Sequence, residues 1–310
     1  MENISEINNT LQSLSRDLAN VIEQASKAVV AVNARRHLSS SGVYWRDSVI
    51  VTAAHTLRRT EDISVILSSG ETVAATLAGA DQSTDLAVLK VNNAKLSAPP
   101  FGDTSKLKVG HVVLAVGRGA QRGLNATLGI VGVLSGAWRT WRGGLIDQLI
   151  GLDLVLHPGA AGGPLVDAHG HVLGINTSGL SRNMELTIPV STVNRVVKHL
   201  LEKGHIGRGY LGLGMYAIPL PEDLKSALNL SADSGLIVVS VEPQGPGSKA
   251  GVRLGDVIVA LEGKDVSNIR DLQAFLEPES VGKTIPVSLI RSGKPVEVNV
   301  TIGERRQRSN

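Results

Sequence analysis

Cysteine is absent from this chain of 310 residues, so neither a disulfide nor a catalytic or metal-binding thiolate contributes to it. Aromatic residues make up only 3%, so valine, isoleucine, leucine and alanine must fill any core. No apolar run is long enough to span a membrane, and the first residues include Glu2, Glu6 and Asp17 instead of an apolar leader. We therefore expect a cytoplasmic protein without a membrane span, unless a leader has been removed.

The composition favours two β-rich domains. The chain is 42% apolar and carries 34 glycines, which suits short strands joined by tight turns. Its net charge of +3 and pI of 9.2 are mildly basic, but lysine and arginine are scattered except around Arg305, Arg306 and Arg308. We interpret this tail as a solvated terminus and expect no nucleic-acid partner.

Residues 156–165 have the pattern of a serine-protease nucleophile loop from which the serine is missing. Glycines in such a loop allow sharp turns that point N–H groups at a developing oxyanion. Gly159 and Ala161 would supply these donors, and Ala160 would line the oxyanion hole. Ala161 stands at the nucleophile position, and alanine differs from serine by one oxygen atom.

Two partners for such a nucleophile precede it in the chain. His55 follows the β-branched run 49–52, which places an imidazole at the end of a strand. Asp85 directly precedes the apolar run 86–89 and has polar neighbours that can orient it. The order His55, Asp85, position 161 is that of chymotrypsin-like proteases, and it differs from the order in subtilisin-like enzymes and α/β-hydrolases.

These three motifs together resemble the trypsin-like domain of HtrA/Deg serine proteases, and the resemblance covers roughly residues 26–303. It implies a mostly β fold with a chymotrypsin-like double antiparallel β-barrel, and polypeptide substrates. Members of this family carry serine where this chain has Ala161, and commonly asparagine where it has Ala160. The first difference removes the nucleophile, and the second changes only the lining of the oxyanion hole.

The segments 208–214, 235–241 and 249–261 resemble a PDZ domain of the kind that follows HtrA protease domains. Tyr210, Leu211, Gly212 and Leu213 match its carboxylate-binding loop, in which small residues leave N–H groups free for a C-terminal carboxylate. We expect a helix over residues 267–276 to form the other wall of the groove. The resemblance thus predicts C-terminal peptides as partners of this domain.

The predicted organisation is an amphipathic helix at 1–28, a protease domain at 29–204, a PDZ domain at 205–303 and a basic tail at 304–310. Apolar residues between positions 4 and 25 alternate in steps of three and four, which fits either a helix packed on its own domain or one that meets neighbouring subunits. The resemblance implies a homo-oligomer, a trimer or a multiple of trimers. A second helix is expected at 191–204, ending at Gly204. Strands are expected at 29–32, 49–52, 63–67, 73–77, 86–91, 112–116, 128–134, 149–156, 172–176 and 186–189.

The resemblance implies that Asn176, Thr177 and Leu186 border the specificity pocket. No aspartate stands at an obvious pocket base, which favours apolar residues at the cleavage site. His169 and His171 are interpreted as exposed turn residues rather than metal ligands, and no metal or cofactor is implied. Trp138 and Trp141 are either loop anchors or contacts to a subunit or substrate.

The sequence therefore predicts a serine endopeptidase for unfolded or C-terminally exposed polypeptides, present here in an inactive Ser-to-Ala form. The alternative is a natural pseudoprotease that acts as a peptide-binding scaffold or holdase. We favour the substituted enzyme, because a long-decayed protease would also have lost His55 or Asp85.

Overall fold

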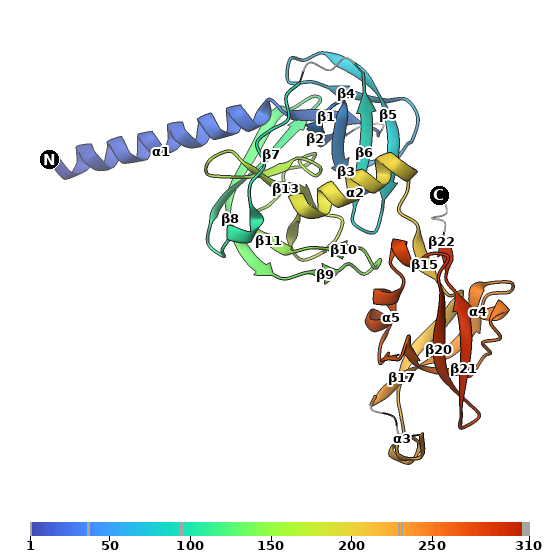
Figure 1. The fold of residues 1–310 in the computed structure, drawn as a ribbon. Coiled ribbons are helices and arrows are strands. Elements are labelled where there is room, and N and C mark those ends of the chain that lie inside the picture. Colours follow the sequence, from blue (N-terminus) through green and yellow to red (C-terminus); the bar gives the residue numbers. More distant parts are fainter. Residues whose placement is uncertain (1, 36–37, 93–95, 229, 231, 306–310) are drawn as a thin grey trace. The chain divides into compact units, whose positions relative to one another are not determined.

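The structure is a computed structural model that describes residues 2–35, 38–92, 96–228, 230 and 232–305. The chain divides into two compact units, Met1–Ile206 and Gly207–Asn310. Figure 1 shows barrels of strands in the first unit and a smaller sheet with short helices in the second. No helix in the described ranges is long and apolar enough to cross a bilayer.

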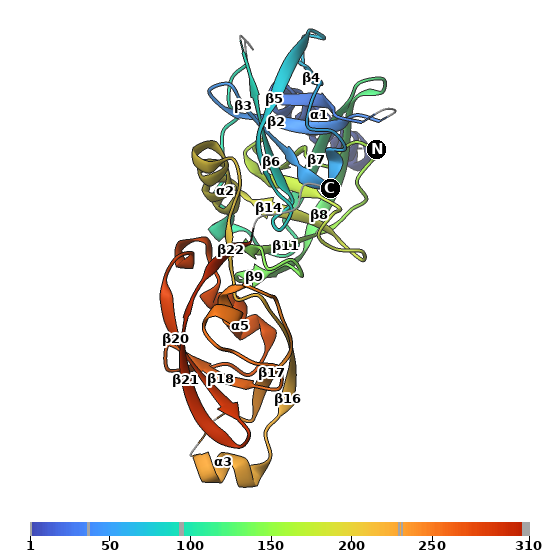
Figure 2. The ribbon, with the colours of Figure 1, turned by 90° about the vertical axis from the view of Figure 1, so that its right-hand side faces the viewer.

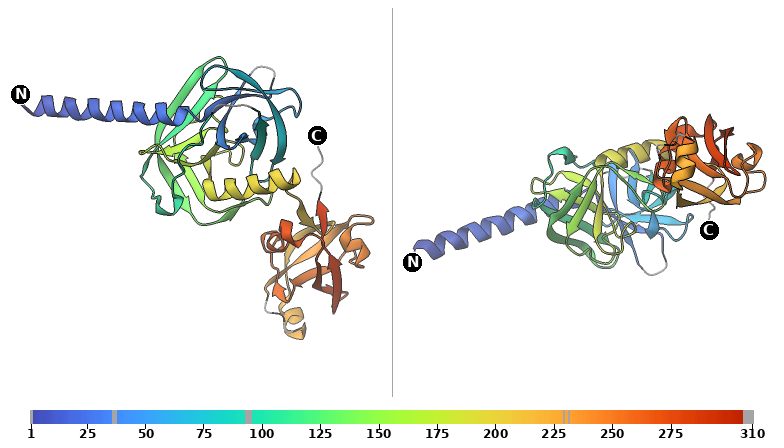
Figure 3. Two further views of the ribbon diagram at one scale, coloured as in Figure 1. Left: turned by 45° about the horizontal axis from the view of Figure 1, so that its top comes forward. Right: turned by 90° about the horizontal axis from the view of Figure 1, so that it is seen from below.

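The first unit begins with helix α1 (Glu2–Ser26). Its amino-terminal part projects away from the barrels, and its carboxyl-terminal end meets the second barrel (Figure 3). Leu18, Val21 and Ile22 pack against the core there, whereas Leu11 and Leu14 are more than half exposed. The apolar stripe seen in the sequence is thus only partly covered within the chain.

Six antiparallel strands close into the first barrel, because each is rich in the small and β-branched residues that fit a pleated, buried surface. Their order around the barrel is β1 (Val29–Asn33), β2 (Ser40–Arg46), β3 (Val49–Ala53), β6 (Leu86–Val91), β5 (Thr72–Asp81) and β4 (Ile63–Ile66). Val30, Ile50 and Leu89 are fully buried inside it.

A second antiparallel barrel follows. Its order is β11 (Leu149–Asp153), β14 (Glu185–Pro189), β13 (Val172–Thr177), β12 (Pro164–Asp167), β7 (Val112–Gly119) and β8 (Gly123–Ser135). The small hairpin of β9 (Trp138–Arg139) and β10 (Leu145–Ile146) stands between β8 and β11. The mostly β class with two antiparallel barrels, predicted from the sequence, is confirmed.

Helix α2 (Val190–Lys203) packs on both barrels, beside β5 and β6 of the first and β13 and β14 of the second (Figure 2). Val193, Val196 and Leu200 are fully buried in the largest core cluster, which contains residues of both barrels. The helix ends where expected, since Gly204 adopts the left-handed conformation that closes a helix. α2 therefore fixes the two barrels against each other.

The second unit is built on a sheet with the order β16 (Leu213–Pro219), β17 (Ser234–Val241), β18 (Val257–Leu261), β20 (Thr284–Arg291) and β21 (Lys294–Thr301). β19 (Lys264–Asp265) pairs with β18, and β15 (Arg208–Tyr210) pairs with β22 (Gly303–Arg305). Its short helices are α3 (Glu222–Leu228), α4 (Pro246–Lys249) and α5 (Ile269–Phe275). Asn268 caps α5 by accepting the N–H groups of Arg270 and Asp271.

The sequence analysis did not predict β2 and β12. It also extended the strand predicted at 149–156 beyond Asp153, where β11 ends. Helix α2 begins one residue before the expected Ser191, after Pro189, which has no side-chain capping bond. The basic tail predicted at 304–310 lies outside the described residues from position 306 onward.

Asp256 is a buried charge whose removal should destabilise the second unit. Its carboxylate accepts two bonds from Arg291, at 2.9 and 2.7 Å, and one from the Arg253 N–H at 2.7 Å. Burial by itself would raise the pKa of Asp256, but these bonds and the positive charge of Arg291 outweigh it and lower the pKa.

We expect Asp256→Asn to destabilise the second unit by about 2 kcal/mol, because it weakens the hydrogen bonds made to the buried, charged carboxylate of Asp256. Since the pKa of Asp256 is lowered on folding, its contribution is present above the ordinary pKa of 3.8 and is lost as the pH falls through the folded value. The variant's deficit should therefore shrink in acid. Hydrogen exchange of peptides from β17 and β20 measures this, with the exposed Asp223→Asn as control. Equal protection in both variants would contradict the assignment.

Candidate active site

His55 lies just beyond the end of β3. A short 3-10 turn over Ala54–Thr56 follows the strand, and Thr56 Oγ1 stabilises it by donating to Ala53 O at 2.6 Å. This turn lifts the imidazole out of the fully buried strand, so that about a third of the side chain is exposed (32%). The ring can therefore meet both the protein and a substrate.

A tight polar turn directly precedes Asp85 and positions it. The buried Asp81 carboxylate accepts the N–H and hydroxyl of Ser83 and the hydroxyl of Thr84, which folds the chain back on itself. Asp85 has a φ of 58°, a left-handed conformation that aspartate tolerates better than most residues. Its carbonyl accepts the N–H of Ala54 at 3.0 Å, which joins this turn to the His55 turn.

Asp85 holds His55 by two contacts. Its Oδ2 lies 2.7 Å from His55 Nδ1, and its Oδ1 accepts the His55 backbone N–H at 2.7 Å. Thr177 Oγ1 also donates to Oδ2, and only 3% of the Asp85 side chain is exposed. Because the carboxylate can only accept, it favours the tautomer with the proton on Nδ1. The other nitrogen, Nε2, is then available to take a proton.

The loop before position 161 forms a turn that suits anion binding. The Ala160 N–H donates to His157 O at 2.9 Å, and Gly159 has a φ of 92°, as expected for a type II turn with Pro158 at its second position. Among the described residues, nothing accepts the N–H groups of Gly159 or Ala161. Of the three residues expected at the oxyanion hole, Gly159 and Ala161 thus keep a free N–H group. The N–H group of Ala160 is used in the turn.

Ser41, on the strand that the sequence analysis missed, supports this loop. Its hydroxyl donates to Gly159 O at 2.7 Å and accepts the Arg118 N–H at 2.8 Å. Its N–H donates to Ala161 O at 3.1 Å. The carbonyls of Gly159 and Ala161 are therefore held by β2, which fixes the orientation of the loop.

Gly162 allows the loop at position 161 to lie close to the chain around His55 and Asp85. A Cβ atom at Gly162 would lie 2.9 Å from Ala53 N, two residues before His55. The Gly162 N–H donates to Asn176 O at 2.8 Å, beside the Thr177 that holds Asp85. The structure thus brings together the loop, the histidine turn and the strand that orients the aspartate.

The three residues expected at the specificity pocket are all buried. The Asn176 amide donates to Pro164 O at 2.8 Å, and its oxygen accepts the Thr187 hydroxyl at 2.8 Å. The Thr177 hydroxyl donates a hydrogen bond to Asp85, and Leu186 belongs to the main core cluster. Thr177 thus has a contact that the sequence did not reveal, and a role of these residues in the pocket stays a prediction.

The loop that carries the tryptophan pair contacts the Asp85 turn. Thr140 Oγ1 donates to Ser83 O at 2.7 Å. Trp138 packs against the core, whereas Trp141 is 72% exposed with the Arg142 guanidinium 4.4 Å from its ring centre. The first tryptophan therefore anchors the loop and the second faces solvent.

The histidine pair after β12 forms no metal cluster. His171 Nδ1 lies 3.2 Å from Asp167 Oδ2, and the His169 N–H donates to Asp167 Oδ1 at 2.8 Å. Within the described part of the chain, no three potential ligands are grouped so as to hold a metal ion.

Gly179 is a site residue that the sequence analysis overlooked. A Cβ atom there would lie 2.6 Å from His55 Nδ1 and 2.7 Å from Asp85 Oδ2. In a chain carrying Ala161→Ser, we expect Gly179→Ala to lower kcat/KM by about a hundredfold, because it displaces one of the two side chains. Peptide hydrolysis measures this. The matched control is Gly136→Ala, where the added methyl meets nothing within 4 Å; equal activity of both variants would rule out the positional role.

The predicted carboxylate-binding loop lies at the start of the edge strand β16. Gly212 has a φ of 69°, and its carbonyl accepts the Glu242 N–H at 2.8 Å. The Leu211 carbonyl accepts the Gly247 N–H at 2.7 Å, while no described acceptor takes the N–H groups of Leu211 and Gly212. Among the strands that the structure describes, β16 pairs with β17 alone, and α5 lies beside it. An extended peptide could therefore add to the open side of this strand.

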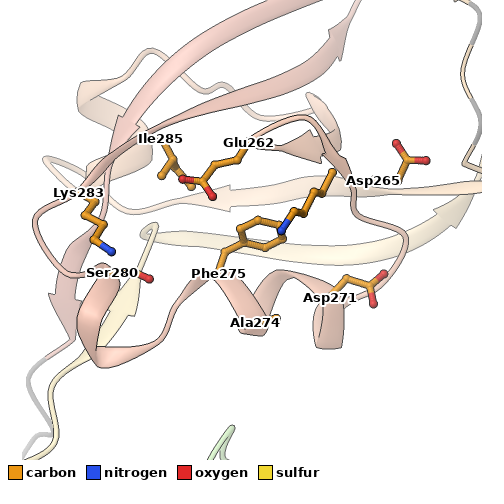
Figure 4. A pocket seen from close by; sticks show the side chains of 9 residues that line it. Glu262, Asp265, Asp271, Ala274, Phe275, Ser280, Lys283 and Ile285 are labelled. Carbon is orange, nitrogen blue, oxygen red and sulfur yellow. The ribbon is translucent and has the colours of Figure 1, made fainter.

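A separate hollow of about 450 Å³ lies between α5 and the strands β18 to β20. Figure 4 shows Phe275 at its centre, with Glu262 and Ile285 above the ring and Lys283 to one side. Three carboxylates and two lysines line it, so charges of both signs largely offset each other. Its lining residues with formal charges are Glu262, Asp265, Asp271, Lys264 and Lys283.

Comparison with known proteins agrees with this architecture. Residues 40–175 match the family described as trypsin-like peptidase domain, and residues 209–302 match the PDZ domain. A probable periplasmic serine endoprotease DegP-like of Brucella suis is 37% identical over 270 residues, covering 85% of this chain and 52% of the relative. The chain spans about half the length of that relative. A serine protease Do-like HtrA of Lactobacillus helveticus is 32% identical over 280 residues, covering 84% and 68%.

Solved structures give the same result. The HtrA-type protease AlgW with decapeptide superposes with a TM-score of 0.74 at 28% identity, covering 93% of this chain and 99% of that one. The serine endoprotease from Yersinia pestis gives a TM-score of 0.75 at 29% identity, covering 92% and 97%. With a trypsin-like peptidase domain followed by a PDZ domain, the chain belongs to the HtrA/Deg family of serine proteases.

Proposed function

We propose that the chain is an HtrA/Deg-type endopeptidase of unfolded or C-terminally exposed polypeptides in which Ala161 replaces the nucleophilic serine. One observation carries the proposal: the 2.7 Å contact between His55 Nδ1 and Asp85 Oδ2, in a site whose loop leaves the Gly159 and Ala161 N–H groups unpaired. A general base, its orienting carboxylate and two oxyanion donors would then be present while the attacking oxygen is missing.

The test is proteolysis of reduced casein by the folded Ala161→Ser protein, analysed by mass spectrometry of the released peptides. We expect new peptides from this variant and none from the chain as it stands. A folded Ala161→Ser protein that releases no peptides would instead favour the second candidate.

That second candidate is a pseudoprotease that acts as a peptide-binding scaffold or holdase. This candidate requires Ala161 to be the natural residue. It is supported by the second unit, where the open edge of β16 and the unpaired N–H groups of Leu211 and Gly212 could hold a peptide carboxylate. We propose C-terminal peptides as partners of this site in either case. The solved structure of the HtrA-type protease AlgW with decapeptide has a similar fold, which supports this proposal.

A homo-oligomer, with a trimer as its unit, stays a proposal. The exposed side chains of Leu11 (59%) and Leu14 (55%) on α1 support it, since they continue the stripe that packs on the barrel. The cytoplasmic location also stays a prediction, and it fits poorly with relatives whose names describe periplasmic proteases.

A further inference from the structure

The turn before Asp85 is held by a second segment of the chain, the loop of the β9–β10 hairpin. Thr140 directly follows β9, and its Oγ1 donates to Ser83 O at 2.7 Å. The same oxygen accepts the Gly144 N–H from the other end of the loop at 3.0 Å. Since Ser83 is two residues from Asp85, one hydroxyl joins the hairpin loop to the turn that carries the proposed catalytic carboxylate.

The contact between the loop and the turn is buried and close. Thr140 and Ser83 are 3% and 2% exposed. A Cβ atom at Gly144 would lie 2.5 Å from Ser83 C and 3.0 Å from Thr84 N, so a side chain there would collide with the turn. The two backbones therefore lie directly against each other, and the Thr140 hydroxyl is the side-chain bond between them.

The hairpin is fixed at its base. Arg195 of α2 donates to Leu145 O at 2.9 Å and to Asp147 Oδ1 at 2.8 Å. Ile146 is 1% exposed in the main core cluster, and Trp138 packs against the same cluster. Because its base is anchored to α2 and to the core, the hairpin can serve as a fixed support for the turn at its tip.

The Asp85 turn has to be held accurately. Asp85 has a φ of 58°, and its two oxygens lie 2.7 Å from the backbone N and the Nδ1 of His55. A hydrogen bond weakens steeply as its angle closes, so a rotation of the turn would weaken one of these contacts. The bond from Thr140 to Ser83 O opposes such a rotation.

We infer that Thr140 is a positioning residue of the proposed active site, which acts through Ser83 on the orientation of Asp85 and so on the direction of the His55 imidazole. The inference rests on the proposed function for its catalytic meaning. The contact between Asp85 and His55 needs no nucleophile, however, and can be measured in the chain with Ala161. No sequence pattern indicated this role, since Thr140 and Ser83 lie 57 residues apart.

A role in stability alone is the rival explanation. Thr140→Val removes the hydroxyl and keeps the shape of the side chain, whereas Thr140→Ser keeps the hydroxyl. A stabilising bond would affect only the unfolding of the domain when it is lost. A positioning bond would also change the state of His55 in the folded protein, and the serine variant would restore that state.

The first test follows the His55 Nδ1–H proton by NMR in the chain with Ala161. A proton shared between Nδ1 and a carboxylate resonates far downfield, and His55→Ala identifies its signal. We expect this signal in the parent and in Thr140→Ser, and its loss or an upfield shift in Thr140→Val. An unchanged signal in Thr140→Val would overturn the inference. Failure of Thr140→Val to fold would overturn it too, because the hydroxyl would then serve the stability of the domain.

The second test measures peptide hydrolysis in the Ala161→Ser background. Thr140→Val should lower kcat at least about tenfold with KM nearly unchanged, because a displaced catalytic group slows the reaction without weakening substrate binding. Thr140→Ser should restore most of the loss. The matched control is Thr192→Val, at a buried threonine of α2 whose hydroxyl accepts the Asp147 N–H at 2.9 Å, away from the Asp85 turn. Equal losses in the two valine variants would show a general loosening of the domain and contradict the inference.

The two tests separate this inference from the proposed function. If Ala161→Ser cleaves nothing while the His55 signal still depends on the Thr140 hydroxyl, the proposed protease activity fails and the positioning role stands. If Ala161→Ser cleaves casein but neither the signal nor kcat responds to Thr140→Val, the protease stands and the positioning role is overturned.

Discussion

Replacing Ala161 with serine is expected to raise the turnover of an unfolded polypeptide by about a millionfold, the loss that removal of a triad nucleophile commonly causes. The loop is already held by Ser41 through the carbonyls of Gly159 and Ala161, so one added oxygen should not change its shape. That oxygen would gain a base in His55 and two free N–H donors for the oxyanion. The rate of peptide release from labelled casein measures the effect.

The control is the same serine variant combined with His55→Ala, which keeps the hydroxyl but removes its base. Its turnover should fall to nearly that of the parent chain with Ala161, since residues of a triad act as a unit. If the double variant were as active as Ala161→Ser alone, the hydrolysis would come from some other group or a contaminant, and the assignment of His55 would fall.

The second large effect is expected at Asp85. In the Ala161→Ser background, Asp85→Asn should lower kcat by about ten-thousandfold, as loss of the orienting carboxylate does in a related triad. An asparagine NH2 facing His55 Nδ1 would force the proton onto Nε2, where it blocks attack. The amide would also meet the Thr177 hydroxyl in place of a charged acceptor.

Steady-state kinetics on one peptide substrate measure this second effect, with KM expected to change far less than kcat. Asp167→Asn is the matched control, because that carboxylate also lies beside a histidine, His171, but outside the site. A loss of similar size in both variants would show that the effect is not specific to the Asp85 contact.

The strand-rich character of the chain and the placing of His55 at a strand end and Asp85 at a turn could be predicted from local patterns in the sequence, whereas the double-barrel fold was predicted from the resemblance to HtrA/Deg proteases. A β-branched run ending in small residues and a histidine gives a strand end, and an aspartate before an apolar run gives a turn. The chain order of such residues then indicates the arrangement. These signals are short-range and can be recognised without knowledge of the packing.

The contacts that complete the site depend on residues far apart in the chain. β2 was missed because its first residues, Ser40, Ser41 and Gly42, are typical of loops. Ser41 is held by Gly159 and Arg118, which lie far from it in the chain. Thr177 was assigned to the pocket, since nothing in the sequence shows that its hydroxyl reaches a carboxylate 92 residues away. The only sequence signal for Gly179 was that it is a glycine close to a predicted strand.

The convergence of His55 and the oxyanion donors on position 161 is tested most directly by labelling the Ala161→Ser protein with a fluorophosphonate, followed by intact-mass and peptide analysis. Such a reagent reacts with a serine only where a base and oxyanion donors converge on it. We expect one adduct per chain, on the introduced serine, and none when His55→Ala is added. A folded protein that stays unlabelled, or labelling that persists without the imidazole, would contradict it.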